Sequence, residues 1–285
     1  MIEEIGYGKI NLALAITGKR DDGYHNIDTI FQAIALHDIV QLEEAGEWQL
    51  TCSEPKLACD ESNLAYKAFK ALQPYSKGRC AHVHIEKHIP IAAGLAGGST
   101  DCAAVLRGLN RLWQLGLSQE TLCQIGASLG ADVPFCICGG SRRGQGIGDQ
   151  LEELPSLPAW EVVIVHPRVP VYTGKAYGLF DRSAHIKPVA VEKAAQAVRQ
   201  QDFTMLTAAM GNTFEELVIP DVPLIEACRS LLQAHGLRPL MAGSGPTVFA
   251  LVPPQEKGQQ VYDKIRDEAS TQPMDVYISR LVRSE

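Results

Sequence analysis

The chain has 285 residues, of which 46% are hydrophobic and 21% are charged, and its formal net charge is −7 at pH 7. This length and composition are those of a globular protein with room for two modest domains. Nucleic-acid binding requires a concentrated basic surface, and the sequence contains no Lys/Arg run longer than a pair. We therefore expect no nucleic-acid partner, whereas a few local donors are enough to bind a small anionic ligand.

The sequence shows no pattern typical of a targeting segment, a membrane span or a disulfide framework. The first residues are acidic and lead directly into patterned sequence, unlike a signal or transit peptide, and no apolar run approaches the roughly twenty residues that span a bilayer. The eight cysteines are scattered and include no Cys-x-x-Cys pair, so we expect free thiols. These features predict a cytoplasmic protein with no membrane partner, and they leave the oligomeric state unknown.

The first half of the chain mixes strand and helix patterns. Alternating apolar residues predict strands over residues 9–17, 30–42 and 81–86. Helical spacing predicts helices over residues 64–72, 101–115 and 118–129. The turn-rich, polar stretch Glu152–Ala159 is the predicted boundary between two domains, residues 1–155 and residues 156–285.

The second half begins with the β-branched run Trp160–Pro167, which a proline ends. Helical patterns follow over residues 191–201, 203–211, 221–235 and 256–269. Strand-like pieces flank the tight turn Gly243–Pro246, and a last strand is predicted over residues 275–281. Strands interleaved with helices predict a small sheet with helices on one face, so the fold class is α+β.

The most informative segment is the glycine loop, Pro90–Asp101, which leads into an alanine-rich helical pattern. Small residues let the backbone approach a bulky anion, and the N–H groups at a helix start, supported by the helix dipole, bind phosphate. An ordinary turn before a capped helix would place Ser99 or Thr100 at the cap and Asp101 in the first turn. Three glycines within five residues, together with two hydroxyls, favour the phosphate site.

Three polar residues elsewhere are candidates for chemistry. Asp132 stands between a glycine that ends a helix and a predicted Val-Pro-Phe strand, where its carboxylate could point into a cleft or stabilise a turn. Lys9 and Asn11 share one face of a predicted strand, and that face could be functional or simply solvated. The P-loop, protein-kinase and Rossmann motifs are missing, which excludes the commonest nucleotide-binding folds.

Two further groups favour a structural interpretation. Arg142 and Arg143 lie in a glycine-rich segment where they could bind an anion, but solvated charges on a flexible turn are the preferred interpretation. His82, His84 and His88 are closely spaced, but no carboxylate or cysteine completes a ligand set, so we expect no structural zinc.

Five ordered segments together resemble the GHMP kinases, the superfamily of galactokinase, homoserine kinase, mevalonate kinase and phosphomevalonate kinase. These segments are Lys9–Leu12, Gly18–His25, the glycine loop, Gly130–Phe135 and Met241–Thr247. The glycine loop and the Gly-Ser-Gly segment are shared across the superfamily, whereas Gly-Lys-Arg-x-Asp-Gly-Tyr-His is typical of one cytidine-reading branch. The resemblance implies an N-terminal domain like ribosomal protein S5 domain 2, a ferredoxin-like C-terminal domain, and an active site in the cleft between them.

The resemblance also implies an activity, the ATP-dependent phosphorylation of the 2-hydroxyl of 4-diphosphocytidyl-2-C-methyl-D-erythritol in the non-mevalonate isoprenoid pathway. Asp132 would take the hydroxyl proton, and Lys9 beside it would keep the carboxyl ionised and offset charge on the moving phosphoryl group. Tyr24 and His25 would hold the cytosine, by stacking and by polar contacts of the imidazole and backbone. Asn11 would contact the methylerythritol or cytidine side.

Tyr177 would supply a second aromatic wall for the base, although a core tyrosine is at least as common in such a segment. The ATP-binding residues implied by the resemblance are Pro90, Ile91, Ala92, Ala93, Gly94, Leu95, Ala96, Gly97, Gly98, Ser99 and Thr100, with Asn63 and Lys87 near the nucleotide. Mg²⁺ would accompany ATP and keep several waters, so few protein ligands are needed, and Ser99 is the candidate.

The glycine loop departs from the family pattern at position 96, where alanine replaces glycine. A positive φ would cost alanine about 1 kcal/mol, so we predict an ordinary backbone conformation at Ala96.

Two other functions are compatible with parts of the sequence. A kinase of the same superfamily that acts on homoserine or mevalonate would have no base to stack, and the Gly23–His25 segment argues against it. A nucleotide-binding protein without catalytic activity would not need both Lys9 and Asp132, and the chain retains both.

Overall fold

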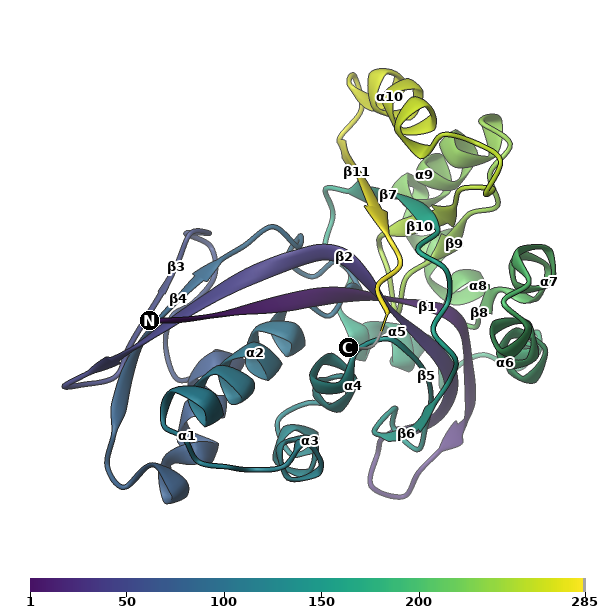
Figure 1. Cartoon of the computed structure of the whole chain (residues 1–285). Helices are drawn as coiled ribbons and strands as arrows, with labels where there is room; N and C mark the ends of the chain where they lie inside the picture. Colours follow the sequence, from purple (N-terminus) through teal and green to yellow (C-terminus); the bar gives the residue numbers. More distant parts are fainter. Residues whose placement is uncertain (284–285) are drawn as a thin grey trace. The chain divides into compact units, whose positions relative to one another are not determined.

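The computed structural model describes residues 1–283 (Figure 1), which form two compact units. The first unit consists of residues 1–8, 36–91 and 96–139, and the second consists of residues 9–35, 92–95 and 140 onward. The long strands β1 (Ile2–Lys19) and β2 (His25–Ala45) each contribute residues to both units. The glycine loop is likewise divided, because Ala92–Leu95 belong to the second unit and the residues from Ala96 onward to the first.

In the first unit, a sheet is covered by helices. Strand β4 (Cys80–Glu86) pairs antiparallel with β2, from Ile39 opposite Glu86 to Ala45 opposite Cys80, and parallel with β3 (Gln49–Cys52). The helices of this unit are α1 (Leu64–Ser76), α2 (Gly97–Leu112), α3 (Gln119–Ala127) and α4 (Val133–Cys138).

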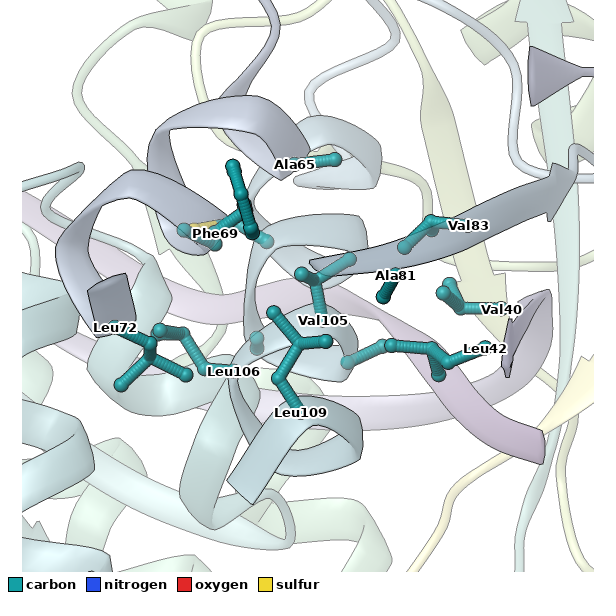
Figure 2. Packing of buried hydrophobic residues seen from close by; sticks show 14 of the residues in the cluster. Val40, Leu42, Ala65, Phe69, Leu72, Ala81, Val83, Val105, Leu106 and Leu109 are labelled. Carbon is teal, nitrogen blue, oxygen red and sulfur yellow. The ribbon is translucent and has the colours of Figure 1, made fainter. Parts of the chain in front are cut away.

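The core of the first unit lies between this sheet and helices α1 and α2. Figure 2 shows Val40, Leu42, Ala81 and Val83 of the strands facing Val105, Leu106 and Leu109 of α2 and Ala65, Phe69 and Leu72 of α1. The strand residues alternate along β2 and β4, as expected where one sheet face is buried. This packing fixes the axis of α2, and therefore the position of its first turn.

The second unit contains a four-stranded antiparallel sheet. Its order is β11-β7-β10-β9, formed by Met274–Arg280, Glu161–Pro167, Val248–Leu251 and Leu240–Met241. The helices α9 (Pro223–Ala234) and α10 (Gly258–Ala269) pack on one face, where Val163 and Val165 of β7 are buried. The other helices of this unit are α5 (Thr173–Phe180), α6 (Val191–Gln200), α7 (Phe203–Ala209), α8 (Glu215–Val218) and a 3₁₀ turn (Ile219–Asp221).

Shorter strands complete the second unit. Strand β8 (Gly211–Asn212) runs parallel to β1, with Ala13 opposite Gly211. Strand β5 (Ser141–Gln145) pairs antiparallel with both β2 and β6 (Gln150–Glu153). The predicted α+β class is confirmed by this arrangement of helices and strands.

Two sequence-based expectations about local structure were wrong. The residues after Asp132 form helix α4 rather than a strand, because Pro134 in the first helical turn has a suitable fixed φ and its missing N–H would have had no partner there. Arg142 and Arg143 lie on strand β5 and not on a flexible turn. Arg143 pairs with Asp28 at 2.8 Å and with Glu192 at 2.7 Å, and these hydrogen bonds raise its pKa.

The clustered histidines make structural contacts. Thr51 of β3 lies 2.9 Å from Nδ1 of His84 and 3.2 Å from Nε2 of His82, and His82 also contacts Glu43. Among residues 1–283, no group of three or more His, Cys, Asp or Glu side chains is placed to hold a metal ion. Within the same residues, no helix has the length and apolar character needed to cross a membrane.

Gly108 in the middle of α2 packs closely against the sheet. A Cβ at position 108 would lie 2.5 Å from Cδ1 of the fully buried Leu42. Replacing glycine by alanine normally stabilises a helix interior by roughly 0.5–1 kcal/mol, but overpacking a core costs about 1–3 kcal/mol. We therefore expect Gly108→Ala to lower the free energy of unfolding, measured by urea denaturation.

The matched control for this prediction is Gly178→Ala in α5, where the nearest atom to the new Cβ would be the flexible end of Arg182 at 3.5 Å. This variant should be neutral or slightly stabilising. Equal stabilisation by the two substitutions would contradict the proposed close contact between Gly108 and Leu42.

Candidate active site

The glycine loop contains three left-handed positions, Ala92 (φ 53°), Gly94 (φ 76°) and Ala96 (φ 61°). The prediction of an ordinary conformation at Ala96 was therefore wrong. Backbone hydrogen bonds on either side explain the result, because Leu95 O accepts from Lys9 N at 3.1 Å and Ala96 O accepts from Thr100 N at 2.9 Å. These bonds fix both peptide planes that flank Ala96, and alanine adopts the conformation that glycine would adopt more easily.

Gly94 is required where the loop meets the Gly-Ser-Gly segment. A Cβ on Gly94 would lie 2.3 Å from the Ala242 carbonyl oxygen and 2.9 Å from that of Gly245. Gly243 has φ 54°, and a Cβ there would lie 3.0 Å from Gly94 O and 3.2 Å from Lys9 Nζ. Asn212 supports this segment by donating hydrogen bonds of 2.7 Å to the carbonyl oxygens of Met241 and Gly243.

The first turn of α2 offers backbone donors. Ala96 occupies the N-cap position and provides no side-chain cap, so the N–H groups of Gly97, Gly98 and Ser99 precede the first intrahelical bond, donated by Thr100. The Thr100 hydroxyl is instead buried and donates to Tyr7 O at 2.6 Å. Such a turn, with its positive dipole end, is suited to binding an anion.

Ser99 of this turn and the turn before α4 lie close to each other. A Cβ on Gly130 would be 3.9 Å from Ser99 Oγ. Asp132 follows in the N-cap position of α4 and is half-buried, and its carbonyl accepts from Cys136 N at 3.0 Å. Its side chain makes no capping hydrogen bond to the backbone of α4.

Lys9 and Asn11 are buried neighbours on β1 and not residues of a solvated face. Lys9 Nζ donates to Asn11 Oδ1 at 2.9 Å, and Asn11 Nδ2 donates to Thr29 Oγ1 at 2.8 Å. Thr29 in turn donates to Ala13 O at 2.7 Å. The exposed fractions of Lys9 and Asn11 are 4% and 1%, and Lys9 Nζ lies 5.6 Å from the centre of the Phe31 ring. The ammonium group is therefore held in a fixed, largely dry position.

Lys87 takes part in a buried ion cluster beneath the first turn of α2. Its Nζ donates to Asp38 at 2.5 Å and to Asp101 at 2.8 Å, and the exposed fraction of its side chain is 6%. Asp38 also accepts from the backbone N–H groups of His88 and Ile89, at 2.6 and 2.9 Å. Within residues 1–283, Asp101 Oδ1 has no hydrogen-bond partner, and burial raises the pKa of this carboxyl to about 7. Sequence reasoning missed Asp38, which no local motif distinguishes.

Asn63 is the N-cap of α1. Its Oδ1 accepts from Ala65 N at 2.9 Å and its Nδ2 donates to Ala58 O at 2.6 Å. Its place near a nucleotide, like that of Lys87, stays a prediction.

The structure brings His25 and Tyr177 together. Their rings stack with centroids 4.7 Å apart, and the Phe180 ring meets His25 edge-on at 5.5 Å. His25 Nε2 lies 2.7 Å from Asp181 Oδ1, a contact that sequence reasoning missed because 156 positions separate the two residues. Tyr24 is 61% exposed, and its backbone N–H donates to Asp22 at 3.0 Å.

Two family models match the chain. The GHMP kinases N terminal domain matches residues 63–140, and the GHMP kinases C terminal domain matches residues 194–271. The glycine loop and Asp132 fall within the first match, and the Gly-Ser-Gly segment falls within the second.

Among curated relatives, the 4-diphosphocytidyl-2-C-methyl-D-erythritol kinase of Exiguobacterium sibiricum is 40% identical over 96% of this chain and 96% of its own length. The enzyme of the same name from Enterococcus faecalis is 38% identical over 90% of this chain and 92% of its own length.

Solved structures agree with the sequence matches. A crystal structure of 4-(cytidine 5'-diphospho)-2C-methyl-D-erythritol kinase superposes with a TM-score of 0.81 at 28% identity, covering 98% of this chain and 99% of the other. The homoserine kinase of Cytophaga hutchinsonii, at 18% identity and a TM-score of 0.78 over 99% of this chain and 95% of its own, shares the fold. The predicted GHMP kinase fold is thereby confirmed.

The left-handed conformation of Ala96 leads to a stability prediction. Removing the Cβ relieves a cost of roughly 1–2 kcal/mol, and the larger entropy of the unfolded glycine chain offsets part of this gain. We expect Ala96→Gly to raise the free energy of unfolding by up to about 1 kcal/mol in urea titrations. The control is Ala93→Gly, at a buried position in the same loop without a positive φ, which should lower stability. Destabilisation by both variants would contradict the strain at Ala96.

The raised pKa of Asp101 leads to a pH prediction. An unfolded aspartate titrates near pH 4, so between about pH 4 and pH 7 the folded chain keeps a proton on Asp101 that the unfolded chain has lost. This contribution to stability must therefore fall as pH rises through that window. We expect Asp101→Asn to remove this part of the slope, as measured by urea denaturation at several pH values. An unchanged slope in the folded variant would show that Asp101 is ionised throughout.

Proposed function

Because the chain belongs to the 4-diphosphocytidyl-2-C-methyl-D-erythritol kinases of the GHMP superfamily, we propose that it transfers the γ-phosphoryl group of ATP to the 2-hydroxyl of 4-diphosphocytidyl-2-C-methyl-D-erythritol. The products are the 2-phosphate and ADP, within the non-mevalonate route to isoprenoid precursors. The proposal rests on curated relatives that all carry this enzyme's name and are 37–40% identical over 96–97% of this chain.

ATP is the phosphoryl donor, and we propose that the loop Pro90–Thr100 binds its triphosphate. The N–H groups of Gly97, Gly98 and Ser99 at the start of α2 support this role, because they are backbone donors at the positive end of a 16-residue helix. The side chain of Thr100 is already bonded within the protein, so its contribution would be structural. In the same proposal, Asn63 and Lys87 lie near the bound nucleotide.

Mg²⁺ would be held mainly by the nucleotide and water. The half-buried Ser99 supplies a hydroxyl oxygen in the first turn of α2, which is a hard ligand of the kind that Mg²⁺ accepts. When bound, the ion would neutralise charge on the phosphates.

We propose that Asp132 accepts the proton of the substrate hydroxyl and that Lys9 stabilises negative charge on the transferred group. An aliphatic alcohol is too weak an acid to ionise first, so proton transfer accompanies a loose phosphoryl transfer, and positioning matters more than basicity. The hydrogen bonds from Lys9 through Asn11 to Thr29 support such a role, because they fix the ammonium before substrate arrives.

On the substrate side, we propose that the cytosine is bound by Tyr24, His25 and Tyr177. Asn11 would contact the methylerythritol or cytidine part of the substrate. The exposed Tyr24 ring and the polar edge of His25 suit a flat base that carries hydrogen-bonding groups. We further propose two functional domains. Residues 1–155 form the N-terminal domain for ATP binding and catalysis, and residues 156–285 form the C-terminal GHMP kinase domain.

The direct test is ADP release coupled to a spectrophotometric readout. The assay compares 4-diphosphocytidyl-2-C-methyl-D-erythritol with methylerythritol phosphate, homoserine and mevalonate. We expect turnover of the first substrate alone. Failure of the well-folded protein to phosphorylate it would refute the proposed function, and turnover of homoserine or mevalonate would assign another member of the superfamily.

Asp132→Asn tests the base. We expect kcat to fall by on the order of a hundredfold or more, with ATP affinity nearly unchanged, because the amide keeps the shape and loses the proton acceptor. The control is Asp263→Asn in α10, where the side chain is 45% exposed, and this variant should leave both quantities unaltered. Near-normal kcat in Asp132→Asn would remove this residue from the role of base.

A further inference from the structure

The contact between His25 and Asp181 controls which hydrogen-bonding groups the imidazole can present. The His25 side chain is only 5% exposed, and its Nε2 lies 2.7 Å from Asp181 Oδ1. The other carboxylate oxygen, Oδ2, accepts from Lys19 Nζ at 2.6 Å. These hydrogen bonds, first that from Lys19 and then that from His25, lower the pKa of Asp181, so the carboxylate is ionised and can only accept.

A ring nitrogen that contacts an ionised carboxylate at this distance must carry a hydrogen. In the neutral imidazole, the proton is then on Nε2, and Nδ1 has a lone pair and accepts hydrogen bonds. The Tyr177 ring stacked at 4.7 Å and the Phe180 edge at 5.5 Å hold the plane of the imidazole. The orientation of the ring and the identity of its acceptor nitrogen are therefore both fixed before a ligand binds.

Cytosine and uracil differ in the group that such an acceptor meets. Cytosine carries an exocyclic amino group, which donates, whereas uracil carries a carbonyl oxygen at the same position, which accepts. An Nδ1 lone pair matches the cytosine amino group and opposes the uracil oxygen. Discrimination of this kind is large where the polar group of the site would be left without a partner.

We propose that Asp181 is a positioning residue that sets the preference for cytidine over uridine, by holding His25 as the Nε2–H tautomer. Asp181 acts through His25 and does not itself contact the base. This inference rests on the proposed function, because it takes the cytidine substrate and the His25 site from there.

The kinetic test compares 4-diphosphocytidyl-2-C-methyl-D-erythritol with its uridine analogue in the wild-type protein and in Asp181→Ala. We expect the ratio of kcat/KM between the two substrates to fall at least fivefold in the variant, through a higher KM for the cytidine substrate, with kcat at saturation within about twofold of wild type. The conservative variant Asp181→Asn, whose amide oxygen can still accept from Nε2–H, should recover part of the preference.

Lys19→Met is the matched control, because it removes the other partner of the carboxylate and leaves the acceptor for His25 in place. It should keep the wild-type preference. An unchanged ratio of kcat/KM in Asp181→Ala, or an equal loss of kcat/KM for the two substrates, would overturn this proposal. The proposed function would still stand. If the wild type phosphorylates neither substrate, the proposed function fails and the preference fails with it.

The tautomer itself is measured by ¹⁵N NMR of the imidazole, assigned with His25→Gln. We expect a protonated Nε2 and an unprotonated Nδ1 in the wild type at neutral pH, and a mixture of tautomers in Asp181→Ala. A purely structural role of Asp181 would not move these shifts in a variant that keeps its thermal stability. An Nδ1–H tautomer in the wild type would overturn the proposal without reference to activity.

Discussion

The N-terminal part of α2 is tied to the sheet by the buried ion cluster of Asp38, Lys87 and Asp101. Asp101 lies in the helix itself, Asp38 lies on β2, and Lys87 follows β4, so one ammonium group ties the start of the helix to the sheet below it. Buried charges are costly unless they are paired and hydrogen-bonded, and Asp38 meets this condition fully through Lys87 and two backbone N–H groups. The cluster therefore adds a polar connection between α2 and the sheet to the hydrophobic packing between them.

The same cluster limits the negative charge near the turn that is proposed to bind phosphate. Two carboxylates against one ammonium would leave a net negative charge next to the turn that is proposed to bind a triphosphate. Burial and the proximity of Asp38 favour the protonated form of Asp101, whereas Lys87 favours the ionised form, and burial is the largest of these effects. A proton on Asp101 lowers the electrostatic repulsion of an incoming anion without removing the packing contact. Both carboxyl groups can thus be kept close to a turn whose proposed ligand is strongly negative.

Local sequence patterns predicted most of the elements of the fold, and they failed where distant residues determine the conformation. The alternating residues of β4 and the helical spacing of α1 and α2 follow from which side chains must be buried, and this information is present in a short window. Ala96 is different, because its positive φ is fixed by a local bond from Thr100 together with a bond from the distant Lys9 to the Leu95 carbonyl oxygen. Arg143 is paired by Asp28 and Glu192, neither of which is near it in sequence.

Candidate site residues show the same division between local and distant causes. Lys9 and Asn11 could be placed on one strand face from their spacing, but only the packed structure shows that this face is buried and that Thr29 orients the amide. His25 could be recognised from a motif, whereas Asp181 lies at the end of α5 and has no motif of its own. A residue that acts through another residue needs only to be adjacent in space, so a sequence pattern built around the contacting residue does not reveal it. The tautomer of a histidine is set by such a neighbour, and for this reason the choice between donor and acceptor at His25 becomes visible only when the fold is known.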